Sequence, residues 1–302
     1  MKTRIIVISS ILAVAVIFCS VVCGVCVESP SAISADEIIT VMTFNVRVDT
    51  NPLDPNGKKV PYDTVAQRSE LIVQHVNDGD ADIICFQEWM TSHESTVWRE
   101  LKYRYNMIAV SRHPTYKLDE KCAILYDKNR FTLVETNTFW LSETPETPSI
   151  GWDAKYYRIC TTAVLYDKIT EKTFRVSNTH LETTGVAQEK GRRLVVDYTV
   201  NSEEPAILCG DFNFDNRYSF YRLTAYKLDD SRTLAPDSIT TASYNAYHKI
   251  FLKTGGHGYP LDHIFLQKDK FTVHSYEVLN YLIDGKFSSD HFPVVAKISI
   301  ND

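Results

Sequence analysis

The stretch Pro205-Ala206-Ile207-Leu208-Cys209-Gly210-Asp211-Phe212-Asn213 joins a short apolar run to an abrupt polar end. Such a run is typical of a buried strand, and the glycine and acidic residue after it mark the point where the strand ends. The pattern predicts that a strand delivers the carboxylate of Asp211 and the amide of Asn213 to one edge of a sheet. The rest of the chain contains further segments of this kind.

Five other apolar segments also carry carboxylates, amides or imidazoles at or beside their ends. Rigid strands that end together are an economical way to converge polar groups on one cleft. The polar residues of these segments are Asn45, Gln87 with Glu88, Asn178 with His180, Asp262 with His263, and Asp290 with His291.

Six motifs, in this order and at these separations, resemble those of the endonuclease/exonuclease/phosphatase superfamily of metal-dependent phosphoesterases. The resemblance covers residues 38–300, and a further segment, Phe139-Trp140-Leu141-Ser142-Glu143-Thr144-Pro145, resembles exported bacterial members. The motifs are Thr43-Phe44-Asn45, Gln87-Glu88, Asn178-Thr179-His180-Leu181, Gly210-Asp211-Phe212-Asn213, Leu261-Asp262-His263-Ile264 and Ser289-Asp290-His291.

Apolar spacing predicts two comparable halves, each with strands, an outer helix and a further strand that ends in a polar tip. The helices are expected at residues 64–76, 95–103 and 187–199. Two such halves suggest two sheets packed face to face. The resemblance implies the same α/β fold, a four-layered sandwich of two mixed, mainly antiparallel sheets with helices outside. We assign this single domain to residues 35–302.

Residues 1–34 read as a secretory leader rather than as part of the fold. Lys2 and Arg4 precede a long apolar run, and small residues such as Ala32 follow it. The sequence therefore predicts a secreted or extracytoplasmic protein. The competing interpretation is an uncleaved signal anchor that holds the domain at a membrane.

The 302-residue chain carries a formal net charge of −6. An acidic surface gives no broad electrostatic drive toward nucleic acid, which disfavours a processive nuclease. Nothing in the sequence indicates an obligate protein partner, so a monomer is expected. Four cysteines lie beyond the leader, and if any pair forms a disulfide, Cys122 and Cys160 are the expected pair.

The resemblance implies a metal site built from Glu88, with Asn45 as its partner and Asp290 completing it. Carboxylate and amide oxygens are hard ligands that select Mg²⁺, with Mn²⁺ as the alternative. Taken singly, Glu88 could be a solvated residue ahead of a helix, and Asn45 could be a turn former. Their place among the other polar strand ends favours the functional interpretation.

In the resembling enzymes the residue at Asp211 activates the attacking water, and the amide at Asn213 holds a phosphate oxygen. His180 and His291 are the remaining proton carriers, and Asp262 is positioned to orient one of them. We assign His291 as general base or phosphate-polarising acid and His180 as transition-state stabiliser, although the two roles are interchangeable at this stage. The neighbouring His263 is expected to pack in the core. The other histidines are interpreted as surface residues: His75, His93, His113, His248, His257 and His274.

Arg158 opens a strand after a proline-rich loop, and its fork of donors suits a bound phosphate. Asn178 comes from the same motif as His180, and we assign Asn178 and Arg158 to phosphate binding. A surface ion pair is the alternative interpretation of Arg158.

Together these residues predict an exported, Mg²⁺-dependent phosphoesterase that hydrolyses phosphodiester bonds, as nucleases do, by attack of an activated water. The substrate is a phosphate ester, either nucleic acid or a phospholipid headgroup. Arg47 stands where abasic-site endonucleases carry an acid, which disfavours DNA repair. The alternatives are a lipid or inositol phosphate phosphoesterase of sphingomyelinase or phosphatase type, and a non-catalytic binding module on the same fold.

Overall fold

The computed structural model describes residues 34–49, 64–116, 120–237, 242–247 and 259–302, which belong to one compact unit. Within them the helices are η1 (Ala35–Glu37, a 3-10 helix), α1 (Val65–Gly79), α2 (Thr91–Ser95), α3 (Val97–Leu101), α4 (Gly185–Val200), α5 (Ser219–Lys227) and α6 (Ser231–Leu234). The strands are β1 (Ile39–Asn45), β2 (Ile83–Trp89), β3 (Tyr105–Ile108), β4 (Lys121–Asp127), β5 (Phe131–Trp140), β6 (Ile159–Asp167), β7 (Thr173–His180), β8 (Ala206–Asp211), β9 (Leu228–Asp230), β10 (Asp262–Gln267), β11 (Phe271–Val278) and β12 (Val294–Ile300).

The strands form two six-stranded sheets with matching connectivity. One sheet has the order β11-β12-β1-β2-β4-β3, and the other has the order β5-β6-β7-β8-β10-β9. In each sheet the third and fourth strands are parallel, β1 with β2 and β7 with β8, while the other neighbours are antiparallel. A helix joins the strands of each parallel pair, α1 in the first sheet and α4 in the second. The expected pair of comparable halves is confirmed.

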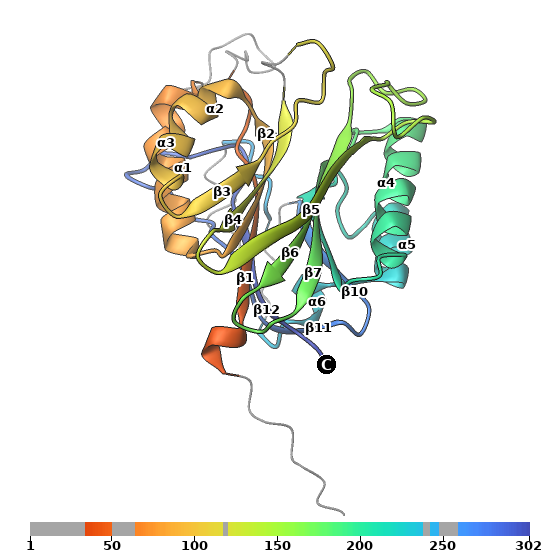
Figure 1. Cartoon of the computed structure of the whole chain (residues 1–302). Coiled ribbons are helices and arrows are strands. Elements are labelled where there is room, and N and C mark those ends of the chain that lie inside the picture. The colour runs from red at the N-terminus through yellow and green to blue at the C-terminus, as the bar shows by residue number, and fades with distance from the viewer. Residues whose placement is uncertain (1–33, 50–63, 117–119, 238–241, 248–258) are drawn as a thin grey trace, which may run out of the picture. The chain divides into compact units, whose positions relative to one another are not determined.

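The two sheets face each other, and the helices cover their outer faces (Figure 1). Alternate residues of β8 show the layering, because Ile207 and Cys209 lie in the core between the sheets while Leu208 packs in the core beneath α4 and α5. Both faces of such a central strand are buried, which explains its unbroken apolar run. The predicted four-layered sandwich of two mixed sheets is confirmed.

The ends of α1 follow from its sequence. Thr64 and Gln67 form a capping box at its start, and Asp80 ends it in the left-handed conformation with φ 41°. The helix predicted at residues 95–103 corresponds to the shorter α3, and Thr96, with φ −123° and ψ −78°, separates α3 from the preceding α2.

Several predictions about single residues can be compared with the structure. All four cysteines of the described residues are free and buried, so the pairing of Cys122 with Cys160 is wrong for this structure. His75 and His93 are fully buried rather than on the surface, and a ring nitrogen of each forms a hydrogen bond with the backbone. His248 and His257 lie outside the described residues. None of the described helices is both long and apolar enough to cross a membrane.

Candidate active site

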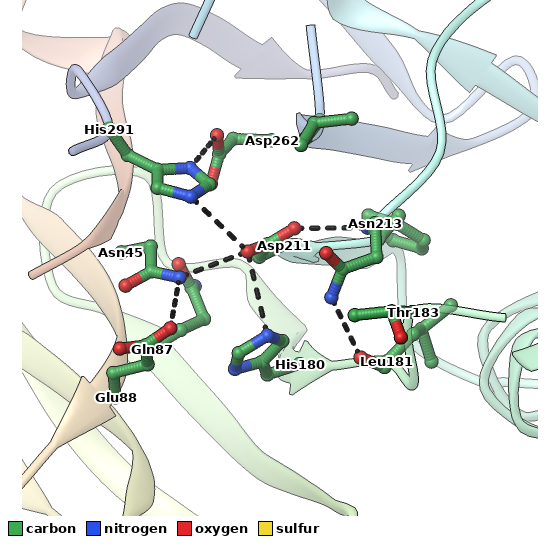
Figure 2. A network of polar contacts seen from close by, with 12 residues as sticks. Asn45, Gln87, Glu88, His180, Leu181, Thr183, Asp211, Asn213, Asp262 and His291 are labelled. Carbon is green, nitrogen blue, oxygen red and sulfur yellow. Dashed lines mark hydrogen bonds and ion pairs between the residues drawn. The ribbon is translucent and has the colours of Figure 1, made fainter. Parts of the chain in front are cut away.

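The carboxyl ends of both parallel strand pairs meet at one edge of the sandwich. Asn45 ends β1, His180 ends β7 and Asp211 ends β8, while Glu88 lies one residue before the end of β2. Strands β1 and β2 lie against β7 and β8, so the four side chains converge from two sheets (Figure 2). Parallel strands joined by a helix present their carboxyl ends on the same side, which makes this convergence a product of the connectivity.

The backbone leaves the extended conformation at three of the strand tips. Arg47, Glu88 and Asn213 have φ values of 58°, 58° and 53°, a left-handed conformation that side chains other than glycine adopt at a cost. At Glu88 the pairing of β2 with β4 also shifts register, between Phe86 and Trp89. Such bulges re-aim a side chain beside a site. Asn213 therefore does not continue the strand of Asp211 as an extended residue.

The Oδ2 atom of Asp211 is the centre of the site (Figure 2). It accepts a 2.9 Å hydrogen bond from Asn45 Nδ2, and it lies 3.5 Å from His180 Nε2 and 3.7 Å from His291 Nε2. Its other oxygen accepts the backbone N–H of Asn213 at 2.9 Å. Asn213 in turn donates its amide to the Leu181 carbonyl, 2.9 Å away. One carboxylate thus faces two imidazoles and an amide at the place where four strands end.

His291 is paired with Asp262 on the side away from Asp211. Its Nδ1 lies 2.7 Å from Asp262 Oδ2 and donates to it, while Nε2 faces Asp211. Burial lowers the pKa of His291, but the negative charges of Asp262 and Asp211 outweigh it and raise the pKa to about 10. This imidazole is therefore a cation at neutral pH.

His180 is the electrostatic opposite of His291. Burial and the positive charges of Arg158, Arg112 and His291 hold its pKa well below the ordinary value, so the ring is neutral. Its Nδ1 lies 4.0 Å from Glu120 Oε2. The two histidines that the sequence left interchangeable consequently differ in charge, one a cationic donor and the other a neutral ring.

The pKa of Asp211 is raised to about 7, because burial and the nearby Asp262 outweigh the attraction of His291 and the hydrogen bonds from Asn45 and Asn213. The ligand atoms of Asp211, Asp262 and His291 lie within 4.8 Å of one another, and His291 would have to lose a proton before it could bind an ion together with the two carboxylates. Glu88 is linked to Asp211 by Asn45, whose Nδ2 also donates to Glu88 Oε1 at 2.9 Å. Such an oxygen-rich, buried set fits a hard divalent cation.

The three predicted metal ligands all make contacts with other protein groups. Asn45 turns its nitrogen toward the carboxylates, and its oxygen accepts the backbone N–H of Arg47 at 3.0 Å. Asp290 accepts a 2.6 Å hydrogen bond from Arg47 Nη1 and one of 3.3 Å from Ser289. Glu88 accepts hydrogen bonds from Asn45 Nδ2 and the Val48 N–H, and among the described residues it has no ion-pair partner. The ligand set as a whole stays a prediction.

The two predicted phosphate-binding residues lie in different surroundings. Arg158 lines a small pocket beside the site with His180 and Glu88, and its Nη2 lies 3.3 Å from Glu182. Asn178 is fully buried between the sheets. Its Nδ2 donates to the carbonyls of Phe86 and Ala123, and its Oδ1 accepts a hydrogen bond from Gln87 Nε2. The structure therefore does not support Asn178 as a phosphate ligand, because its side-chain atoms already hold the two sheets together.

Sequence reasoning missed two arginines beside the site. The sequence pattern marks Arg47 only as a departure from the abasic-site endonucleases, although Arg47 lies two residues after Asn45 and belongs to the same strand tip. Arg68 is fully buried and donates to the carbonyls of Val46, Arg47, Val48 and Ser288. The sequence pattern of the helix does not show that Arg68 is buried, because an arginine at this position looks the same as one on the surface.

The chain is similar to several known proteins. A family model described as the endonuclease/exonuclease/phosphatase family matches residues 42–291. A solved structure of such a family protein from Bacteroides thetaiotaomicron is 30% identical, with a TM-score of 0.76, covering 88% of this chain and 98% of its own. A mannosyl-6-phosphatase from the same organism is 29% identical, with a TM-score of 0.73 and coverages of 86% and 99%. An uncharacterized protein of Acanthamoeba polyphaga mimivirus is 27% identical over 245 residues, which are 76% of this chain and 90% of that protein.

Proposed function

The chain belongs to the endonuclease/exonuclease/phosphatase family of phosphoester hydrolases, and from this premise we propose a Mg²⁺-dependent phosphoesterase that cleaves its substrate by direct attack of water. The observation that carries the proposal is the position of Asp211. Its Oδ2 faces His180, His291 and Asn45 at the meeting point of the two sheets. A binding module on the same fold has no need to gather a carboxylate and two imidazoles in this way.

In the proposed reaction Asp211 accepts a proton from the attacking water. Its raised pKa, about 7, suits it to this role near neutral pH. His291, cationic and held by Asp262, donates a hydrogen bond to a phosphate oxygen from Nε2, and Arg158 supplies a second positive charge. A divalent cation held by Glu88 would neutralise charge on the phosphate. Asn45 keeps the two carboxylates at a fixed separation.

The first substrate class to test is a phosphomonoester of a sugar or similar small polyol. It is supported by the similarity to the mannosyl-6-phosphatase and by the net charge of −6, which gives a long nucleic acid no general attraction. The phosphodiester substrate expected from the sequence is the second class. Secretion, or retention at a membrane by the N-terminal segment, remains part of the proposal and rests on residues 1–34 of the sequence.

The test is hydrolysis by the full-length protein of mannose 6-phosphate, p-nitrophenyl phosphate, bis(p-nitrophenyl) phosphate, RNA and sphingomyelin. Each substrate is assayed with Mg²⁺, with Mn²⁺ and with EDTA. We expect hydrolysis of at least one of these esters, which EDTA abolishes and Mg²⁺ restores. Turnover that EDTA leaves unchanged would contradict the metal-dependent mechanism, and a folded protein inert toward every substrate would favour the binding module.

A further inference from the structure

Arg47 lies beside the catalytic groups with its side chain mostly buried, at 13% exposure. Its Nη1 donates to Asp290 Oδ2 at 2.6 Å, and its guanidinium carbon lies 5.0 Å from the ring centre of Tyr247. The negative charges of both Asp290 and Glu88 act on the guanidinium group, which places it at the edge of the same site. The ion pair and the ring fix the direction in which the guanidinium plane points.

The hydrogen bonds of this guanidinium group are incomplete. An arginine side chain carries five N–H donors, and buried polar groups are nearly always satisfied. Among the described residues only Asp290 accepts from the Arg47 side chain, and its Nε is buried without an acceptor. A buried cation with unused donors at the edge of a catalytic site is suited to bind a ligand oxygen.

The backbone of Arg47 is held in place on both sides. Its N–H donates to Asn45 Oδ1 at 3.0 Å, and its carbonyl accepts from Arg68 Nη2 at 3.1 Å. The next residue, Val48, donates its N–H to Glu88 Oε2 at 2.7 Å. These contacts maintain the left-handed backbone, with φ 58°. Together with the Asp290 ion pair, these contacts order the side chain before substrate binds, so binding loses less conformational entropy, as in preorganised anion sites.

We propose that Arg47 binds a non-bridging oxygen of the substrate phosphate and makes the site prefer dianionic phosphomonoesters over monoanionic diesters. The inference rests on the proposed phosphoesterase function and names a residue that selects its substrate class. A monoester has one more negative charge and one more free oxygen than a diester. A fixed guanidinium with unused donors gains most from that additional oxygen.

The test compares Arg47→Gln and Arg47→Lys with the wild-type full-length protein. Isothermal titration measures inorganic phosphate binding in the presence of Mg²⁺, and kinetics measure kcat/KM on p-nitrophenyl phosphate and bis(p-nitrophenyl) phosphate. For Arg47→Gln we expect about a 100-fold loss on the monoester, about a 10-fold loss on the diester and weaker phosphate binding, the scale of one lost charged donor. Arg47→Lys is expected to retain part of the preference for the monoester, because lysine keeps the positive charge but lacks the paired N–H donors of the guanidinium group.

Arg104→Gln is the matched control. Arg104 also pairs with an aspartate at 2.6 Å, Asp80, and lies 5.1 Å from the ring of Tyr105, but it stands at the opposite end of β2. We expect no change in the ratio of the two activities. Equal losses of Arg47→Gln on both substrates, with unchanged phosphate binding and thermal stability, would overturn the inference while leaving the phosphoesterase intact. A wild-type protein that neither binds phosphate nor hydrolyses either ester would overturn both.

Discussion

Asn45 and Asp211 come from different sheets, and Asn45 Nδ2 donates a 2.9 Å hydrogen bond to Asp211 Oδ2. The same nitrogen donates to Glu88 Oε1, so one amide separates two carboxylates that would otherwise repel each other. This contact joins the two halves of the sandwich at the catalytic centre. It also means that the site is sensitive to any change of charge at Asn45.

Asn45→Asp is expected to make the stability of the protein depend strongly on a divalent cation. The substitution replaces a bridging donor by a third carboxylate at a fully buried position, which costs about 1–3 kcal/mol without metal. A bound cation offsets part of the repulsion. Thermal unfolding in EDTA and in Mg²⁺ measures the effect, and the rise in Tm on adding Mg²⁺ should exceed that of the wild type. An equal rise in both proteins would contradict a cation site at these carboxylates.

Asp211→Asn and His291→Ala are each expected to lower kcat by about 1000-fold, because each removes a group with a direct role in the proposed reaction. Steady-state kinetics on the best substrate provide the measurement, and far-UV circular dichroism checks the fold. Either variant with a near wild-type rate would lose its assigned role.

Asp262→Asn is expected to lower the pKa of His291. Burial alone would lower this pKa, and Asp262 is the first of the charges that raise it to about 10. Since the folded pKa lies above the ordinary 6.5, the charged ring stabilises the protein fully below about pH 6.5, and this stabilisation is lost as the pH rises through 10. NMR titration of the His291 ring in the metal-free protein tests this. A midpoint that does not move on substitution would show that the Asp262 contact contributes little.

Gly210→Ala is expected to destabilise the protein by about 3 kcal/mol or more. A Cβ at Gly210 would lie 2.2 Å from the Thr179 carbonyl oxygen on the paired strand, where the backbone has no room to move. Gly285→Ala is the control, because Gly285 has φ +74° but nothing within 4 Å of the added atom, so about 1 kcal/mol is expected. Urea unfolding measures both, and equal losses would contradict the role of close strand approach.

Asn178→Ala is expected to lower the stability of the protein, whereas Arg158→Gln is expected to weaken substrate binding. Asn178→Ala leaves the buried carbonyls of Phe86 and Ala123 without their donor, which costs about 2–3 kcal/mol, with little change in KM. Arg158→Gln is expected to raise KM for the phosphate ester by about 10-fold while keeping most of the stability. Unfolding and kinetics on both variants separate the two roles. A raised KM in folded Asn178→Ala would restore the original assignment to phosphate.

The sequence by itself determined the layered architecture and the residues at the strand ends. The apolar runs before Asp211, Glu88 and Asn45 are long enough to be strands and are buried on both faces, so their position in the sheets followed from pattern alone. The order and spacing of the polar tips then identified the family that the comparisons confirm. Local pattern suffices here because burial and strand length are properties of short segments.

Only the tertiary structure decided what each polar tip contacts. The amide of Asn178 faces the other sheet rather than the site, and Arg47 meets Asp290 from a position far away in the chain. The opposite charge states of His180 and His291 arise from which arginines and carboxylates surround each ring. These properties depend on distances between residues from different strands and loops. Coulomb energies and hydrogen bonds vary over a few ångströms, a scale that the order of residues along the chain does not specify.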